Sequence, residues 1–174
     1  SNKHNTSIKG VCWYSKGFIH NGSHFFNLLE YWLGPMKRFR LININKQRIS
    51  DEDYEPDVEV EFKKGSIIFL SAWEEVFSHY TIELLSPIGR IRYDNEGATI
   101  HFQDVIDDSV FKGYKVLNPE VKDILNNMQH SQLNVADQLS ERLKGNISYL
   151  CSGKEALKTL MSMQLIIDRI GKNG

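Results

Sequence analysis

The sequence predicts an α+β fold, because strand-like segments fill the middle of the chain and helical spacing appears near both ends. The clearest strand is 57–63, where valine and phenylalanine alternate strictly with charged residues. The clearest helix is 152–171, where apolar residues recur every three or four positions. Ser152 is its expected N-cap, with Glu155 as the partner of a capping box. Strands and helices that are segregated along a chain are typical of α+β domains.

Length, composition and charge place the chain among ordinary globular proteins. Of its 174 residues, 41% are hydrophobic and 25% are charged, which is enough for one domain with a substantial core. We therefore expect a single domain over 1–174, since no repeat or composition break marks a second. The net charge of −1 provides no basic field for nucleic acid or for an anionic membrane, so neither is expected as a partner.

Two further features bear on where the protein works. No apolar run approaches the length needed to cross a membrane, and no signal peptide opens the sequence. The two cysteines, Cys12 and Cys151, lie far apart and form no Cys-x-x-Cys pair. We therefore expect a reduced, cytoplasmic protein, with a single disulfide between the two cysteines left open.

Alternation and turn residues predict the remaining elements. The run 67–73 is apolar on both faces, so we expect a central strand that is covered on both sides. The polar segment 46–56 reads as a loop with an acidic cluster, and 133–143 has helical spacing that ends at Gly145. The other expected strands are 8–15, 36–45, 79–85, 89–93, 98–103 and 114–117.

The segment 17–35 is where polar chemistry is expected. It reads as a turn and one amphipathic helix, which Asn21 or Ser23 can cap and which Gly34 and Pro35 end. One face carries the apolar side chains expected in the core, which are Phe25, Leu28, Leu29 and Trp32. Another face carries the polar side chains His24, Asn27 and Tyr31, with His20 one turn before His24.

The two histidines have three interpretations. Both could cap and pack the start of the helix. They could be two metal ligands one turn apart, although the segment lacks the glutamate of a His-Glu-x-x-His site and has no obvious third ligand nearby. His24 could instead transfer protons or bind substrate, since imidazole is the side chain whose usual pKa suits proton transfer near neutral pH.

The segment 14–29, closed by Trp32-Leu33-Gly34, resembles the start of the C-terminal domain of Gfo/Idh/MocA-type oxidoreductases, the group of glucose–fructose oxidoreductase and inositol dehydrogenase. The resemblance extends over nearly the whole chain. It includes the strand segment Gly89-Arg90-Ile91 and the helix start at 152–157.

The resemblance implies an open, mainly antiparallel sheet with helices packed on one face, which binds substrate and mediates oligomerisation. It also implies an N-terminal Rossmann domain that binds NAD or NADP and carries a catalytic lysine in a Glu-Lys-Pro motif. This chain contains neither Gly-x-Gly-x-x-Gly nor Glu-Lys-Pro. We therefore expect it alone to bind no nicotinamide cofactor and to show no dehydrogenase turnover.

The resemblance also assigns site residues. His24 matches the histidine of an Asp-x-x-x-His motif and is expected to be the catalytic base, while His20 stands where the aspartate is common, and Asn27 replaces a second frequent aspartate. His20 and Asn21 are expected to orient or bind substrate hydroxyls. Lys16 and Tyr14 are weaker candidates for the rim, with an exposed lysine and a sheet-packing tyrosine as the alternatives.

The expected substrate is a sugar, sugar nucleotide or polyol, with no metal. A non-catalytic α+β binding or dimerisation module is the alternative, and a metal-dependent enzyme using His20 and His24 is a third, weaker one. We expect a homo-oligomer, because 67–73 leaves no polar face for water. The competing explanation is that 104–127 folds over the sheet.

Overall fold

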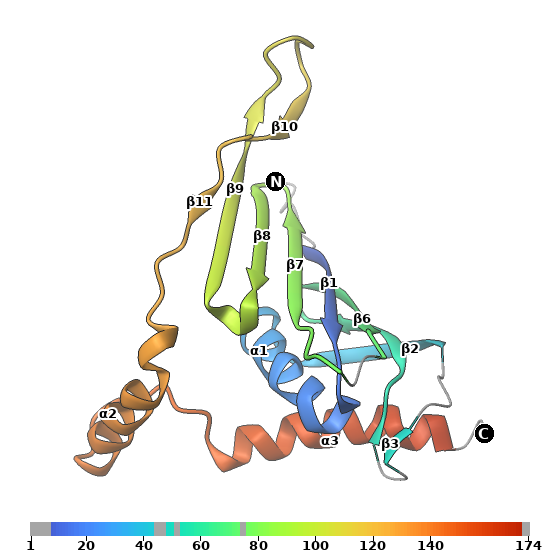
Figure 1. Ribbon diagram of the computed structural model, residues 1–174, viewed down its shortest axis with the longest axis vertical. Coiled ribbons are helices and arrows are strands. Elements are labelled where there is room, and N and C mark those ends of the chain that lie inside the picture. Colours follow the sequence, from blue (N-terminus) through green and yellow to red (C-terminus); the bar gives the residue numbers. More distant parts are fainter. Residues whose placement is uncertain (1–7, 44–47, 51–52, 74–75, 172–174) are drawn as a thin grey trace, which may run out of the picture.

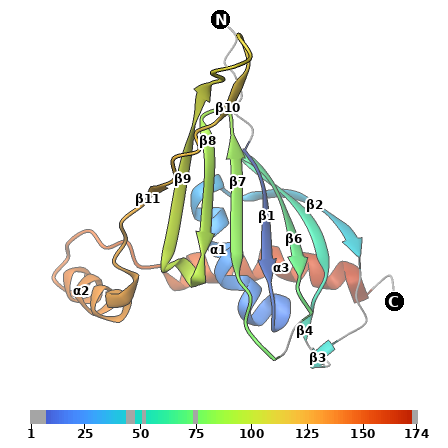
Figure 2. The ribbon, with the colours of Figure 1, turned by 45° about the horizontal axis from the view of Figure 1, so that its top comes forward.

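The computed structural model of the protein describes residues 8–43, 48–50, 53–73 and 76–171. Its centre is one nine-stranded sheet in the order β10-β9-β8-β7-β1-β6-β5-β2, with β11 also paired to β9 (Figures 1 and 2). Among these strands only β1 and β6 run parallel, which confirms the open, mainly antiparallel sheet. The strands are β1 (Ile8–Tyr14), β2 (Met36–Asn43), β5 (Asp57–Phe62), β6 (Gly65–Ser71), β7 (Thr81–Ser86), β8 (Gly89–Asp94), β9 (Thr99–Asp107), β10 (Lys115–Leu117) and β11 (Lys122–Asp123).

The first strand lies in the middle of the sheet. Val11 of β1 is opposite Ile68 of β6 on one side and Glu83 of β7 on the other. The strands β2, β5 and β6 form one antiparallel group, and β7, β8 and β9 form another. β1 therefore joins two groups that have no other ladder between them among the described strands.

Two helices cover one face of the sheet, α1 (Ser23–Leu33) and α3 (Gly153–Gly171) (Figure 2). Aromatic rings form the centre of the core: Phe26 stacks on Phe69 with ring centres 5.5 Å apart, and Phe18 meets Phe69 edge-on at 6.0 Å. Met163 and Ile166 of α3 are fully buried against this cluster. The expected helix-covered sheet is thus confirmed.

The capping box of α3 is also confirmed. The Ser152 amide and hydroxyl each donate a hydrogen bond of 2.7 Å to the Glu155 carboxylate, and the Glu155 amide donates back to the Ser152 hydroxyl at 3.3 Å. α1 ends as expected at Gly34, whose φ of 82° lies in the region that favours glycine.

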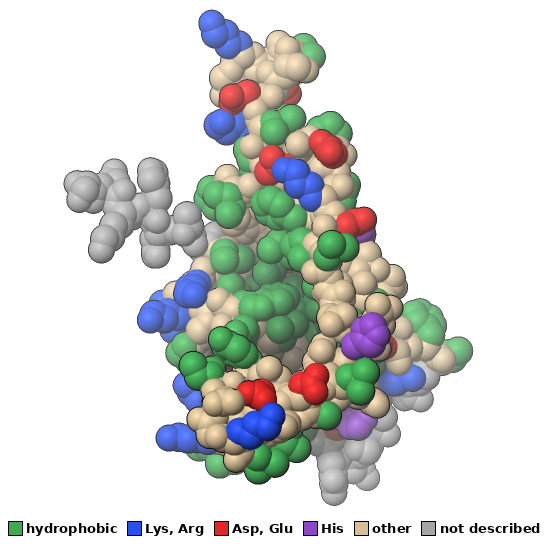
Figure 3. All heavy atoms as spheres, turned by 90° about the vertical axis from the view of Figure 1, so that its left-hand side faces the viewer, with side chains coloured by type: hydrophobic (Ala, Val, Ile, Leu, Met, Phe, Trp, Pro, Cys, Tyr) green, Lys and Arg blue, Asp and Glu red, His purple; other side chains and the backbone are tan. Residues whose placement is uncertain are grey.

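The helix α2 (Ser131–Leu143) has the expected helical spacing but does not reach the core. Its apolar residues Leu133, Leu139 and Leu143 are exposed, and every one of its described residues is at least partly exposed. It follows the short helix η3 (Met128–His130) and stands away from the sheet (Figure 1). Viewed from the side on which α2 lies in Figure 1, the molecule shows a hollow in which hydrophobic side chains gather (Figure 3).

Within the described part of the chain, only one face of 67–73 is covered, so cover on its second face stays a prediction. Ile67 and Phe69 are buried under the helices, but Ile68 and Leu70 point to the other face and are half-buried. The segment 104–127 does not lie over that face. It continues β9 and then forms β10 and β11, which pair with β9 near the edge of the sheet, and part of it projects beyond the sheet (Figure 1).

The expected loop at 46–56 contains short strands. β3 (Arg48–Ser50) pairs with β4 (Asp53–Tyr54) in a separate two-stranded sheet. Asp51 and Glu52 of the predicted acidic cluster lie outside the described residues, as does Ile44 of the second expected strand. A short 3-10 helix, η2 (Asn95–Gly97), links β8 to β9. No helix in the described ranges is both long and apolar enough to cross a membrane.

Candidate functional site

The histidine-bearing helix does not begin as expected. A π-helix, η1 (Gly17–Gly22), precedes α1, and it starts at a sharp turn where Lys16 has a φ of 62° and Gly17 a φ of 95°. Neither Asn21 nor Ser23 caps the start of α1, whose N-cap position is Gly22. The Ser23 hydroxyl instead donates to the His20 carbonyl at 3.0 Å, so the predicted side-chain cap is wrong.

Two carboxylates from a distant segment fix the start of η1 instead. The Asp53 carboxylate accepts the amides of Ile19 and His20, both at 2.8 Å, and Glu55 accepts the amide of Gly17 at 2.9 Å. Free amides and the helix dipole at an N-terminus both favour negative charge, so acidic side chains suit this position. A Cβ on Gly17 would collide with Asp53, so only glycine fits this turn.

Glu55 is the more buried of the two carboxylates, with 3% of its surface exposed. Its other oxygen accepts the hydroxyl of Ser71 at 2.9 Å. Glu55 thus connects the end of β6 to the first residue of η1, and a buried carboxylate of this kind is stable only because its oxygens are hydrogen-bonded.

His24 lies at a cavity that could hold a small molecule. Its side chain is exposed and lines a cavity of about 860 Å³ together with Asn27 and Tyr31, which confirms that these three residues share a face of α1. The opposite wall is formed by the loop 148–152 and by the first turns of α3. A cavity of this size is within the range of small-molecule sites.

The other predicted site residues do not line this cavity. Tyr14 is fully buried, its hydroxyl donates to the Pro56 carbonyl at 2.6 Å, and burial raises its pKa well above the usual value. These contacts match the packing alternative. The Asn21 side-chain amide donates to the Tyr80 hydroxyl at 2.6 Å and to the Ser15 carbonyl at 3.2 Å, which holds η1 to the chain around β1 and β7. His20 is exposed and Lys16 is half-buried.

A polar chain between α1 and α3 is not evident from the sequence. The Asn27 side-chain amide donates to the Thr159 hydroxyl at 2.9 Å, and that hydroxyl donates to Glu30 at 2.7 Å. Ser162 donates to the same carboxylate at 3.4 Å. Thr159 is only 3% exposed, so this chain fixes the two helices that wall the cavity. The available signal was a threonine within the apolar spacing of the last helix.

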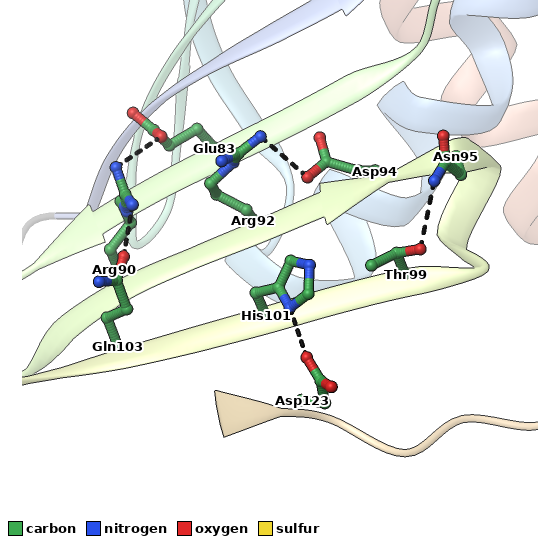
Figure 4. A network of polar contacts seen from close by, with 9 residues as sticks. All are labelled: Glu83, Arg90, Arg92, Asp94, Asn95, Thr99, His101, Gln103 and Asp123. Atoms are coloured by element: carbon green, nitrogen blue, oxygen red, sulfur yellow. Dashed lines mark hydrogen bonds and ion pairs between the residues drawn. The ribbon is translucent and has the colours of Figure 1, made fainter. Parts of the chain in front are cut away.

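A second polar cluster lies on the sheet face that the helices leave open (Figure 4). Arg90 pairs with Glu83 at 3.4 Å and Arg92 with Asp94 at 3.1 Å, while His101 contacts Asp123 at 2.7 Å. The charges of the two arginines and their carboxylate partners compensate one another within the sheet. The described residues contain no group of three or more histidine, cysteine, aspartate or glutamate side chains that could hold a metal ion.

The chemistry available at the cavity is therefore that of an exposed imidazole beside hydrogen-bonding groups. A neutral imidazole accepts a proton at one ring nitrogen while it donates at the other. His24 can take a proton from a hydroxyl in the cavity, and Asn27 and Tyr31 lie beside it along the same face of α1.

Neither a protein-family model nor a curated protein sequence matches this chain. Solved structures do match. The WlbA dehydrogenase from Bordetella pertussis, in complex with NADH and UDP-GlcNAcA, is 14% identical, with 97% of this chain and 54% of that chain covered and a TM-score of 0.61. The aldose-aldose oxidoreductase from Caulobacter crescentus, complexed with glycerol, is 16% identical, with 98% and 55% covered and a TM-score of 0.66.

A levoglucosan dehydrogenase in complex with NADH and L-sorbose is 10% identical, with 95% of this chain and 57% of that chain covered and a TM-score of 0.66. The chain thus spans about half the length of the solved structures that it matches. At these identities the likeness concerns the fold. The chain has the fold that Gfo/Idh/MocA-type oxidoreductases share over about half of their length, as the motif at 14–34 predicted.

Proposed function

We propose that this chain is the C-terminal substrate-binding and oligomerisation domain of an NAD(P)-dependent oxidoreductase that acts on a hydroxyl of a sugar, sugar nucleotide or polyol. The observation that carries the proposal is the position of His24 at the cavity between α1 and α3, in a fold shared with dehydrogenases. Structures of similar fold contain UDP-GlcNAcA, L-sorbose or glycerol, all of which bear hydroxyls.

The cofactor would be held outside this chain. The sequence has no Gly-x-Gly-x-x-Gly loop, whose glycines allow close backbone approach to a pyrophosphate, so its residues do not fit NAD or NADP. An N-terminal Rossmann domain of the full-length protein would bind the cofactor and supply hydride chemistry. This chain would bind the substrate, orient its hydroxyl and move the hydroxyl proton.

Within that division of labour, His24 is the proposed base. It would accept the proton of a substrate hydroxyl in the oxidation direction and return it in the reverse direction. Asn21 would act indirectly, because its amide is already bonded to Tyr80 and Ser15. His20 stays a candidate for contact with substrate hydroxyls, since it is exposed and its backbone is fixed by Asp53.

The role of His24 is tested in the full-length enzyme. Because general acid–base groups contribute about 10²–10⁴-fold, His24→Ala should lower kcat by about that factor on a sugar or polyol substrate. His130→Ala is the matched control, since His130 is exposed on η3, away from the cavity lining. Near-normal turnover of His24→Ala would contradict the assignment. Absence of turnover in the unaltered enzyme would favour the non-catalytic module.

The cofactor assignment is tested on the 174-residue chain itself. Calorimetric titration with NAD and with NADP should show no binding, because the chain lacks a pyrophosphate loop. Micromolar binding of either cofactor would contradict the proposal.

The oligomerisation role rests on the open face of the sheet. There Val11 and Trp13 of β1 lie beside Ile68 and Leu70 of β6 and form an apolar strip with them, and Trp13 is exposed. Monomers seldom leave such patches uncovered, and two copies packed face to face across a two-fold axis would bury it.

Light scattering tests this assembly. The chain mass is 20.1 kDa, so a dimer should have twice that mass at micromolar concentration, and Leu70→Glu should convert it to a monomer. Leu165→Glu is the control, because Leu165 is an exposed leucine on α3 and not on the sheet. A uniform species near 20.1 kDa for the unaltered chain would contradict the dimer.

A further inference from the structure

The cavity beside His24 is built from three separate parts of the chain. The polar face of α1 forms one wall, the end of α2 contributes Arg142, and the loop 148–152 with the first turns of α3 forms the rest. Its volume of about 860 Å³ is near the upper end of the range of about 300–1,000 Å³ for small-molecule sites. The cavity is therefore larger than a single sugar ring requires.

More cationic than anionic side chains line this cavity. Its cationic side chains are Arg142, Lys154 and Lys158, to which His24 adds a charge when protonated. Its two carboxylates are Glu30 and Glu155. The positive groups thus outnumber the negative ones, in a chain whose overall net charge is −1.

Both carboxylates are already occupied. Glu30 accepts hydrogen bonds from Thr159 and Ser162, and Glu155 accepts two from Ser152 in the capping box. Arg142 contributes to lowering the pKa of Glu155 through its charge, after the larger effect of the Ser152 hydrogen bonds. Lys154 and Lys158 have no hydrogen-bond or ion-pair partner among the described residues.

The N-terminus of α3 is not itself the group that would bind an anion. Glu155 already bonds to the amide and hydroxyl of Ser152 there, so the helix dipole is met by a side chain of the protein. The capacity for an anion comes from the side chains of Lys154, Lys158 and Arg142. Lysine binds phosphate as a compact point charge, and arginine binds it through two parallel donors.

We propose that this cavity binds a phosphorylated sugar, with Lys154, Lys158 and Arg142 at the phosphate and His24 at a hydroxyl of the sugar. Lys154 and Lys158 in the first turns of α3 and Arg142 at the end of α2 all line this cavity. A phosphate ester uses both the spare volume and the spare positive charge, whereas a neutral sugar uses neither. The assignment of this ligand as the substrate rests on the proposed function, but the binding does not.

Binding is measured by calorimetry on the 174-residue chain with four probes: glucose, glucose 1-phosphate, UDP-glucose and inorganic phosphate. The two phosphorylated sugars should bind, and their affinity should fall as the salt concentration is raised. Their affinity should exceed that of glucose and of inorganic phosphate by at least about tenfold. Tighter binding of UDP-glucose than of glucose 1-phosphate would identify a nucleotide sugar, and equal binding would identify a simple phosphate ester. Both results support the proposal.

Variants locate the site. Lys154→Ala combined with Lys158→Ala should lower the affinity for the phosphorylated sugars by about tenfold or more, and Lys158→Glu alone should do the same. The matched control is Lys112→Ala with Lys115→Ala, two exposed lysines on the projecting β9–β10 segment. Far-ultraviolet circular dichroism checks that each variant is folded.

Two results would overturn the proposal. One is that glucose or inorganic phosphate binds as tightly as the phosphorylated sugars. The other is that the double lysine variant binds them as well as the control does. Neither result depends on turnover, so either of them would refute this inference and leave the proposed role of His24 in oxidising a sugar hydroxyl standing.

Discussion

The carboxylate of Glu55 accepts the backbone amide of Gly17 at 2.9 Å, although 38 residues separate the two in the chain. Gly17 is the first residue of η1, and His24 follows one residue into α1. The backbone that presents the proposed base is therefore held by a side chain from the segment before β5.

Glu55→Ala tests the strength of this connection. It would leave the Gly17 amide and the Ser71 hydroxyl without their buried acceptor, at an expected cost of about 1–3 kcal/mol of unfolding free energy. Urea denaturation followed by circular dichroism measures it. Glu59→Ala is the control, because Glu59 forms a partly exposed ion pair with Arg40 and should cost about 1 kcal/mol or less. Equal losses for the two variants would show that Glu55 has no special role.

Thr159→Val tests the polar chain between the two helices. The substitution keeps the shape of the side chain but removes the hydroxyl that joins Asn27 to Glu30, so we expect a loss of about 1–3 kcal/mol in unfolding free energy. Thr81→Val on the open sheet face is the matched control and should change stability by about 0.5 kcal/mol or less. If Thr159→Val unfolds at the same urea concentration as the control, the hydrogen bonds of the Thr159 hydroxyl do not hold α1 and α3 together.

The capping box of α3 should make part of the stability depend on acid. Hydrogen bonds from the Ser152 side chain, and then from its amide, lower the pKa of Glu155 from its usual value of 4.5. Because the folded-state pKa is the lower one, the contribution is present above pH 4.5 and is lost as the pH falls through the folded-state value. Glu155→Gln should therefore lose less stability than the unaltered chain on acidification below that pH.

Thermal melting at several pH values measures the difference, with Glu120→Gln as the control for the loss of one exposed carboxylate. The control should follow the acid dependence of the unaltered chain. An identical acid dependence in Glu155→Gln would count against the capping box as its source.

The two cysteines should differ in reactivity. Cys151 is exposed, whereas Cys12 is fully buried and burial raises the pKa of its thiol, so it stays protonated and shielded. A thiol reagent at pH 8 should label one cysteine per native chain and two after denaturation. Cys151→Ser should abolish the rapid native reaction. Labelling of two thiols in the native chain would contradict the buried position of Cys12.

The strands could be predicted because alternation is a local signal. In β5, Val58, Val60 and Phe62 are all buried, as the strict alternation of the sequence requires. The helix spacing likewise predicted α2, but spacing reports a conformation and not whether anything covers its apolar face. Leu133 and Leu139 illustrate this difference, since both fit the spacing and both are exposed.

The start of the site could not be predicted in the same way. Asn21 and Ser23 have the chemistry of a helix cap, but local rules cannot detect that Asp53 and Glu55 arrive from a distant hairpin and take that role. The face shared by His24, Asn27 and Tyr31 follows from helical geometry and was predictable. Its opposite wall comes from α3 and the loop before it, which only the folded chain brings near.

The central position of β1 has a consequence for how the protein folds. Ile8 to Tyr14 is synthesised before its partners at 65–71 and 81–85, so this strand stays unpaired until both of them have been made. Pairings of such long sequence separation are slow to form, and an unpaired apolar strand is exposed to wrong partners while it waits. Each of the two strand groups can form by local hairpins. The insertion of β1 between them is thus the step at which folding of this sheet is expected to be slowest.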